Sequence, residues 1–186
     1  MSGLEFARGI PGSVGGGVRM NAGAYGGNLG QLVTRIEAID RKGEKLVLNA
    51  DQLEFGYRNT SLFELDAIVT KVHLKLVEGD SEQIMEIMKE YSRKRSANQP
   101  LEYPSCGSVF RNPPDDHAGH LIEMAGLRGT KCGGVEVSTK HGNFIINTGG
   151  GTAADVRELM DQVQQAVYEY AGIQLEPEVR FVGEFE

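Results

Sequence analysis

The chain has 186 residues, of which 40% are hydrophobic and 24% charged, so it can form the core of one large domain or two small ones. Its formal net charge of −7 argues against a nucleic-acid partner, because phosphate binding relies on a basic surface. No apolar run approaches the roughly 20 residues of a membrane span, and we expect neither a signal peptide nor a membrane partner. The two cysteines lack metal-ligand spacing and indicate reduced thiols in a cytoplasmic protein.

Glycine is concentrated near the start of the chain, in residues 9–17 and 21–27. Glycine loses more backbone entropy on folding than any other residue, so this concentration needs a positive φ or a close approach to explain it. Exposed backbone N–H groups suit a phosphate or pyrophosphate. Interleaved apolar residues such as Ile10 and Val14 argue against a mobile linker. We therefore predict an ordered loop that holds an anion or a cofactor.

The next segments read as sheet and then as helix. We predict a hairpin in which the segments 32–40 and 44–48 flank Arg41-Lys42-Gly43. Side chains alternate between the two faces of a strand over residues 67–77. The period then changes to that of a helix, which begins at Asp80 or Ser81 and ends before Pro100.

The second half mixes both kinds of element. We predict strands at 106–111, 134–137, 143–147 and 178–182, a short helix at 118–125 and a long one at 153–171. Thr152 and Asp155 predict a capping box for the long helix, and Gly172 predicts its end. The chain is thus an α+β protein with a first part at 1–79 and a second part at 80–186.

Three polar residues are candidates for chemistry. Arg58, between two short strand candidates, either binds a carboxylate or phosphate or bonds backbone carbonyls in a turn. Ser108 follows a glycine and is a proton donor, a nucleophile in need of a base, or a turn residue. Glu178 donates a proton if it faces a pocket, where burial would raise its pKa, or else lies solvated on an edge strand.

Two further segments have simpler explanations that we favour. His117 and His120 beside two aspartates suit a metal, yet no further ligand cluster completes a site, and the acids also suit a helix start. We therefore expect no metal. Residues 149–152 suit an anion at a helix N-terminus, but also a plain loop followed by a cap.

Several motifs together resemble the UDP-N-acetylenolpyruvoylglucosamine reductase (MurB) family, in that family's order along nearly the whole chain. They are Gly9-Ile10-Pro11-Gly12-Ser13-Val14-Gly15-Gly16, Asn21-Ala22-Gly23-Ala24-Tyr25-Gly26, Phe55-Gly56-Tyr57-Arg58, Gly107-Ser108-Val109-Phe110-Arg111-Asn112-Pro113, Gly133-Gly134-Val135 and Leu175-Glu176-Pro177-Glu178-Val179-Arg180. The resemblance implies the remainder of the second FAD-binding (VAO/PCMH-like) subdomain, followed by a MurB C-terminal α+β domain that binds substrate.

The resemblance also implies an activity. NADPH would reduce FAD, and reduced FAD would pass hydride to the enolpyruvyl group of UDP-N-acetylglucosamine enolpyruvate, giving UDP-N-acetylmuramate for peptidoglycan. Arg58 would stabilise the substrate carboxylate, Ser108 would protonate C2, and Glu178 would assist. Substrate contacts would come from Asn112 and Arg180. The residues expected to line the flavin are Gly9, Ile10, Pro11, Gly12, Ser13, Gly15, Gly16 and Asn21.

The first residues of this chain already match the middle of the family sequence, so we expect an N-terminally truncated member of the shorter subtype. With part of the FAD cradle missing, we expect the chain alone to bind FAD weakly or not at all and to be inactive. Two other functions stay open, a non-catalytic nucleotide-sugar-binding fragment and a different FAD-linked oxidase.

Overall fold

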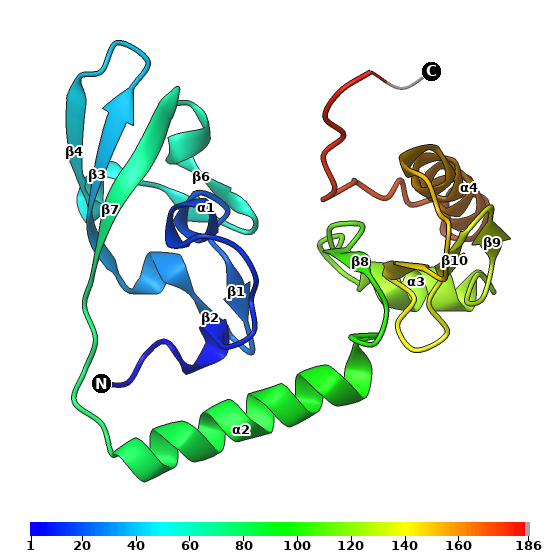
Figure 1. The fold of residues 1–186 in the computed structure, drawn as a ribbon, viewed down its shortest axis with the longest axis horizontal. Helices are drawn as coiled ribbons and strands as arrows, with labels where there is room; N and C mark the ends of the chain where they lie inside the picture. Colours follow the sequence, from blue (N-terminus) through cyan, green and yellow to red (C-terminus); the bar gives the residue numbers. More distant parts are fainter. Residues whose placement is uncertain (185–186) are drawn as a thin grey trace. The chain divides into compact units, whose positions relative to one another are not determined.

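The structure is a computed structural model that describes residues 1–184, and the chain divides into two compact units, Met1–Lys94 and Arg95–Glu186 (Figure 1). Each unit has its own hydrophobic core. No helix among the described residues is long and apolar enough to cross a membrane.

A three-stranded antiparallel sheet forms the centre of the first unit, in the order β4-β3-β7. It consists of β3 (Val33–Asp40), β4 (Lys45–Asn49) and β7 (Ala67–Leu74), which confirms the predicted hairpin and most of the predicted strand at 67–77. The carboxylate of Asp40 accepts hydrogen bonds from the N–H groups of Lys42 and Glu44 and so fixes the turn. Ile36 and Ala38 bury one face of the sheet.

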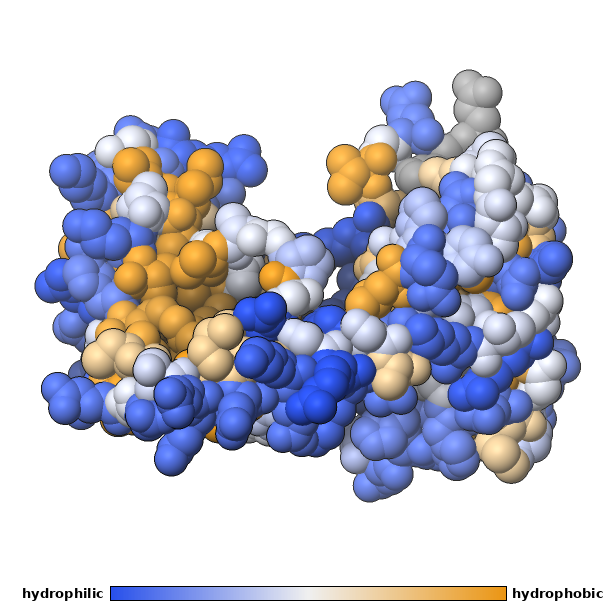
Figure 2. Space-filling model, turned by 60° about the horizontal axis from the view of Figure 1, so that its bottom comes forward, coloured by the Kyte–Doolittle hydropathy of each residue, from blue (hydrophilic) through white to orange (hydrophobic). Residues whose placement is uncertain are grey.

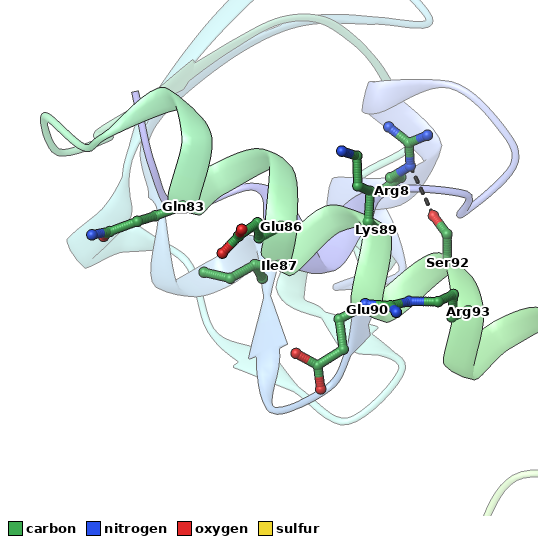
Figure 3. Close-up of a pocket in the computed structure, with 8 residues that line it drawn as sticks. All are labelled: Arg8, Gln83, Glu86, Ile87, Lys89, Glu90, Ser92 and Arg93. Atoms are coloured by element: carbon green, nitrogen blue, oxygen red, sulfur yellow. Dashed lines mark hydrogen bonds between the residues drawn. The ribbon is translucent and has the colours of Figure 1, made fainter.

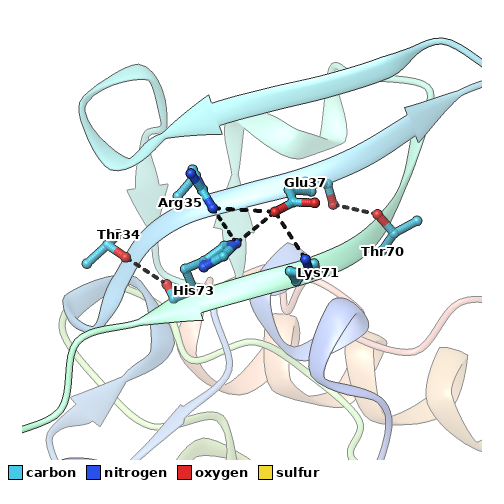
Figure 4. A network of polar contacts seen from close by, with 6 residues as sticks. All are labelled: Thr34, Arg35, Glu37, Thr70, Lys71 and His73. Atoms are coloured by element: carbon cyan, nitrogen blue, oxygen red, sulfur yellow. Dashed lines mark hydrogen bonds and ion pairs between the residues drawn. The ribbon is translucent and has the colours of Figure 1, made fainter.

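A polar network lies on the sheet, centred on Glu37 (Figure 4). Its Oε1 is 2.9 Å from Nε2 of His73 and 3.5 Å from Nζ of Lys71. The hydrogen bond from His73 is the main cause that lowers the pKa of Glu37. Because these groups are solvated, the network contributes little to stability. Elsewhere on this unit Figure 2 shows apolar residues gathered at the surface, the kind of patch that a partner or a further segment usually covers.

Short elements complete this unit around the sheet. They are β1 (Gly23–Ala24), β2 (Gly27–Asn28), β5 (Phe55–Gly56), β6 (Asn59–Thr60) and the 3₁₀ turns η1 (Glu5–Ala7), η2 (Leu29–Gln31), η3 (Ala50–Gln52) and η4 (Ser61–Phe63).

The loop predicted for the glycine segment 9–17 is correct only for its first part, because a helix begins at Val14. Helix α1 (Val14–Arg19) begins after Ser13, whose hydroxyl accepts a hydrogen bond from Gly16 N–H. A Cβ on Gly15 would lie 3.3 Å from the carbonyl oxygen of Val69 on β7. Glycine is therefore used here for close helix–strand packing, which outweighs its poor helix propensity.

The long helix α2 (Ser81–Asn98) begins where the sequence predicts, since the carboxylate of Asp80 accepts from Glu82 and Gln83 N–H. It has no buried side chain. Tyr91 stacks on Tyr25 at 4.2 Å between ring centroids. A groove of about 910 Å³ runs along its flank, where the guanidinium of Arg8 donates to Ser92 Oγ (Figure 3).

Most of α2 therefore belongs to the first unit, which ends at Lys94. The domain limit predicted after residue 79 stays a prediction.

The second unit contains a four-stranded antiparallel sheet in the order β8-β11-β10-β9. Its strands are β8 (Ser105–Ser108), β9 (Lys131–Cys132), β10 (Val135–Val137) and β11 (Phe144–Asn147), and its helices are α3 (Ala118–Met124) and α4 (Ala153–Ala171). The two predicted helices and three of the four predicted strands are confirmed. The short strand β9 was not predicted.

Helix α4 carries the main apolar stripe of this unit. Its buried side chains are Leu159, Met160, Val163 and Val167. The predicted capping box of Thr152 and Asp155 is confirmed, and Gly172 ends the helix at φ 70°. Hydrogen bonds from Thr152 and Gly134 N–H lower the pKa of Asp155. The triglycine segment before the helix is thus a loop that leads into a capped helix.

The strand predicted at 178–182 is wrong. Pro177 forms one isolated bridge with Phe110, and no strand is assigned from Glu178 to Val182. A proline has no N–H to donate, and the backbone pairing seen at residues 176–178 does not extend into a ladder.

Gly134 is the glycine most closely packed against backbone. A Cβ there would meet Gly151 N and lie 2.5 Å from Gly149 O. We expect Gly134→Ala to lower the free energy of unfolding by about 2–4 kcal/mol, because backbone atoms cannot move aside cheaply. Gly56→Ala is the matched control, since its Cβ would lie 3.8 Å from Asn59 Cβ and should change stability by less than about 1 kcal/mol. Urea unfolding followed by circular dichroism measures both, and equal effects would refute the expectation.

Candidate functional site

Arg58 lies in the turn of the β5–β6 hairpin, in the first unit. Strands β5 and β6 pair Phe55 with Thr60 and Gly56 with Asn59, which leaves a two-residue turn. Arg58 has φ +53°, and its guanidinium carbon is 5.2 Å from the ring centroid of Tyr57. The left-handed conformation costs a non-glycine residue on the order of 1 kcal/mol, and such residues cluster at functional sites. The turn thus holds a half-buried cation in an uncommon backbone conformation.

Asn21 holds this hairpin in place. Its side-chain Nδ2 donates to Gly56 O at 2.9 Å, and its Oδ1 accepts from Gly30 N–H at 2.9 Å. Asn21 is buried and also has a positive φ, of +45°. The structure therefore shows a positioning role that the sequence did not reveal, while contact with a cofactor stays a prediction.

The glycine segment ahead of α1 is open to solvent. Gly9, Gly12 and Ser13 are exposed, and a Cβ on Gly12 would meet nothing within 4 Å. The first N–H groups of a helix lack intrahelical partners. The backbone at Gly12 therefore lies beside open space that leaves room for a ligand, whereas Gly15 packs against β7 and Gly16 N–H is bonded to Ser13 Oγ.

Ser108 ends strand β8 in the second unit. It pairs with Phe144 on β11, while Ser105 pairs with Ile146, so β8 carries one extra residue. Gly107 accommodates this bulge at φ +81°. Bulges re-aim side chains and are frequent beside active sites. Ser108 is half-buried.

Glu178 comes to lie next to this strand. Its N–H donates to Val109 O at 2.8 Å, and Arg111 N–H donates to Glu176 O at 2.8 Å. The structure thus brings the backbones of Ser108 and Glu178 onto adjacent segments although 70 positions separate them in the sequence. Glu178 is half-buried, so a proton-donating or electrostatic role is sterically open to it.

Asn112 and Arg180 lie on the same two segments. Asn112 is exposed, and its Oδ1 accepts a hydrogen bond from Ala118 N–H at the start of α3. Arg180 lines a largely apolar cavity of about 410 Å³, together with Cys106. Burial raises the pKa of the Cys106 thiol, which disfavours a nucleophilic thiolate. Arg58 belongs to the first unit.

The histidine-aspartate segment forms a helix start. Asp116 Oδ1 accepts from His117 N–H and lies 3.0 Å from Nδ1 of His120. The backbone bond from His117 is the main cause that lowers the pKa of Asp116. Within residues 1–184, no group of three His, Cys, Asp or Glu side chains is arranged to hold a metal ion.

One buried polar residue beside Ser108 was not predicted. Asn143 is 4% exposed and bonds to both backbone polar groups of Phe110. Its only sequence signal is a polar residue at the head of the apolar run Phe144–Ile146.

The chain is similar in sequence and in fold to known proteins. Residues 99–182 match the family described as UDP-N-acetylenolpyruvoylglucosamine reductase, C-terminal domain. Proteins named UDP-N-acetylenolpyruvoylglucosamine reductase are 49% identical over 184 residues in Pediococcus pentosaceus and 45% identical in Staphylococcus carnosus. The chain belongs to this family.

These alignments cover 99% of the chain but 61% and 60% of the two relatives, so the chain spans about three-fifths of their length. The crystal structure of UDP-N-acetylenolpyruvylglucosamine reductase (MurB) from Thermus caldophilus matches with a TM-score of 0.84 and 40% identity. That match covers 96% of this chain and 64% of the other. The predicted fold and family are confirmed, while the assignment to the shorter subtype stays a prediction.

The left-handed backbone of Arg58 allows a stability test. Glycine adopts this conformation without the Cβ penalty, and alanine does not. We expect Arg58→Gly to be more stable than Arg58→Ala by about 1 kcal/mol in urea unfolding. Both variants lose the same side-chain contacts, so each is the control for the other. An alanine variant as stable as the glycine variant would show that the turn is not strained.

We also expect the second unit to lose stability at acidic pH because of His141. Burial and, secondly, the charge of Arg128 lower the pKa of His141 in the folded protein. Its contribution to the free energy of unfolding is therefore fully present above the unfolded pKa of about 6.5 and is lost as the pH falls through and below that value. His141→Gln removes this proton uptake, so we expect a shallower loss of stability on acidification than in the wild type. Identical pH slopes of the two proteins would contradict this assignment.

Proposed function

We propose that this chain is part of an NADPH-dependent, FAD-mediated reductase that converts UDP-N-acetylglucosamine enolpyruvate to UDP-N-acetylmuramate for peptidoglycan synthesis in the cytoplasm. The names of its relatives support the reaction. The observation that supports the site assignment is the hydrogen bond from Glu178 N–H to the carbonyl oxygen of Val109, the residue that follows Ser108.

The residues of the first unit fit a flavin nucleotide. The exposed glycines at 9–12 leave room for close approach, and the N–H groups at the start of α1 suit a pyrophosphate. Asn21 fixes the adjoining hairpin and would keep the cradle in shape. When bound, FAD reduced by NADPH supplies the hydride for C3 of the enolpyruvyl group.

Arg58 would bind the substrate carboxylate. Negative charge develops on this carboxylate as hydride reaches C3, and a guanidinium can donate hydrogen bonds to both of its oxygens at once. The turn of the hairpin fixes the backbone that carries the guanidinium, so little reorganisation is needed as charge develops.

Ser108 would deliver the proton to C2, and Glu178 would supply or stabilise that proton. A hydroxyl is a weak acid, so it needs a neighbour that restores its proton or favours the charge that it develops. The carboxyl group of Glu178, whose backbone pairs with that of Val109, would suit that task. Asn112 and Arg180, on the same two segments, would contact the substrate's polar groups.

The chain alone would lack activity and bind FAD weakly or not at all, because it spans about three-fifths of its relatives. Its second unit would still bind the nucleotide-sugar substrate. Binding without reduction in the complete protein would favour the non-catalytic fragment, and peroxide production in place of substrate reduction would favour a different oxidase.

Calorimetric titration of the chain with UDP-N-acetylglucosamine enolpyruvate tests this proposal. We expect measurable binding that Arg180→Ala weakens about tenfold through loss of charge-assisted hydrogen bonds. Arg128→Ala is the matched control in the same unit, because Arg128 pairs with Glu123 and lies outside the proposed site. Absence of binding, or equal loss in both variants, would refute the assignment.

The visible absorbance of the same sample with added FAD gives a second readout. We expect little flavin to stay with the chain after gel filtration. One flavin retained per chain would contradict the expectation of an incomplete cradle.

A further inference from the structure

Asn143 makes an unusual set of contacts for a single residue. Its Oδ1 accepts from Phe110 N–H at 2.9 Å, and its Nδ2 donates to Phe110 O at 2.8 Å. Its own carbonyl oxygen accepts from Val109 N–H at 2.9 Å. The carboxamide thus takes the place of a neighbouring strand's peptide group beyond the last paired residue of β8.

Phe110 depends on this carboxamide. It is 2% exposed, so its N–H and C=O would lose water as partners on folding. A buried backbone group left without a hydrogen-bond partner destabilises the fold, because nothing replaces the water that it loses. Phe110 is also midway between Ser108 and Asn112 in the sequence. The two hydrogen bonds from the Asn143 carboxamide to Phe110, which we call the Asn143 clamp, therefore fix the backbone that carries both proposed site residues.

The opposite edge of the same segment holds Glu178. Val109 O accepts from Glu178 N–H at 2.8 Å, and Arg111 N–H donates to Glu176 O at 2.8 Å. Residues 109–111 therefore lie between the Asn143 carboxamide on one side and the 176–178 segment on the other. A shift of Phe110 would move Ser108 relative to Glu178.

We propose that Asn143 is a positioning residue that sets the alignment of Ser108 and Asn112 with Glu178 through the backbone of Phe110. This inference rests on the proposed function for the roles of these three residues. It assigns to Asn143 no contact with substrate, and it adds a residue from a different strand to the machinery.

The neighbour of Asn143 is consistent with a fixed geometry. Asn143 N–H donates to Nδ1 of His141 at 3.2 Å, which requires an unprotonated nitrogen there. The ring of His141 packs against Phe144, with 4.8 Å between centroids. Burial lowers the pKa of His141 and so keeps the nitrogen available near neutral pH.

Asn143→Asp tests the proposal with a nearly isosteric change. It replaces the Nδ2 donor by a carboxylate oxygen facing Phe110 O, which turns an attraction into a repulsion. Asn147→Asp is the matched control, because Asn147 is on the same strand and bonds only to the 149–151 loop through its side chain. Asn143→Ser is a second variant that removes the clamp without adding a charge.

Two measurements at neutral pH decide the outcome, with folding of each variant checked by circular dichroism. In amide hydrogen exchange, we expect Phe110 and Glu178 to exchange at least about tenfold faster in the Asn143 variants and unchanged in Asn147→Asp. In calorimetry with UDP-N-acetylglucosamine enolpyruvate, we expect about tenfold weaker binding in both Asn143 variants than in the wild type.

The outcomes separate this inference from the proposed function. Unchanged exchange at Glu178, or faster exchange with unchanged affinity, overturns the positioning role, because a purely structural residue would alter stability only. A wild-type chain that does not bind the substrate refutes the proposed function. In that case the amide exchange of Glu178 alone decides whether Asn143 positions Ser108 and Asn112 relative to Glu178.

Discussion

The pairing of buried backbone groups in the 109–111 segment is the constraint on which the second unit depends. This segment continues β8 beyond the paired part of the sheet, where β11 can no longer supply a ladder partner. Its polar groups still need partners, since Val109 and Phe110 are almost fully buried. An asparagine side chain and the 176–178 backbone meet this need from opposite sides. The proposed proton donors are therefore fixed by the same bonds that satisfy the core.

The first unit solves a similar problem with the same kind of side chain. Asn21 links Gly30 in η2 with Gly56 in β5 and so orders the hairpin that carries Arg58. A carboxamide has both a donor and an acceptor, and it can replace a missing peptide partner on irregular backbone. In each unit a buried asparagine thus supports a loop that bears a candidate catalytic residue.

The sequence predicts the regular elements well, because their side chains repeat with the period of the structure. The stripe of α4 and the alternation of β7 are examples. Prediction from the sequence fails for segments whose hydrogen-bonding or packing partners are distant in the sequence. The stretch 178–182 has a strand-like composition, yet its backbone bonds to residues 109–111 are those of Glu178 and Val179 N–H to Val109 O, and they form no ladder. The helix over glycines 15–17 contradicts intrinsic propensity, and only the approach of β7 explains it.

The candidate site shows the same division between local and distant information. Arg58, Ser108 and Glu178 were candidates on residue type and local sequence, which left structural explanations open, and their catalytic roles were implied by the resemblance of short motifs to the MurB family. Asn21 was predicted as a cofactor contact, and the structure shows its side chain bonded to the backbone of η2 and of β5. Asn143 was not predicted, because its partner Phe110 is 33 positions away and nothing local indicates that its carboxamide is buried. Residues that act on a ligand can thus be proposed from motifs, whereas residues that hold those residues in place become visible only when backbone hydrogen bonds are traced across the fold.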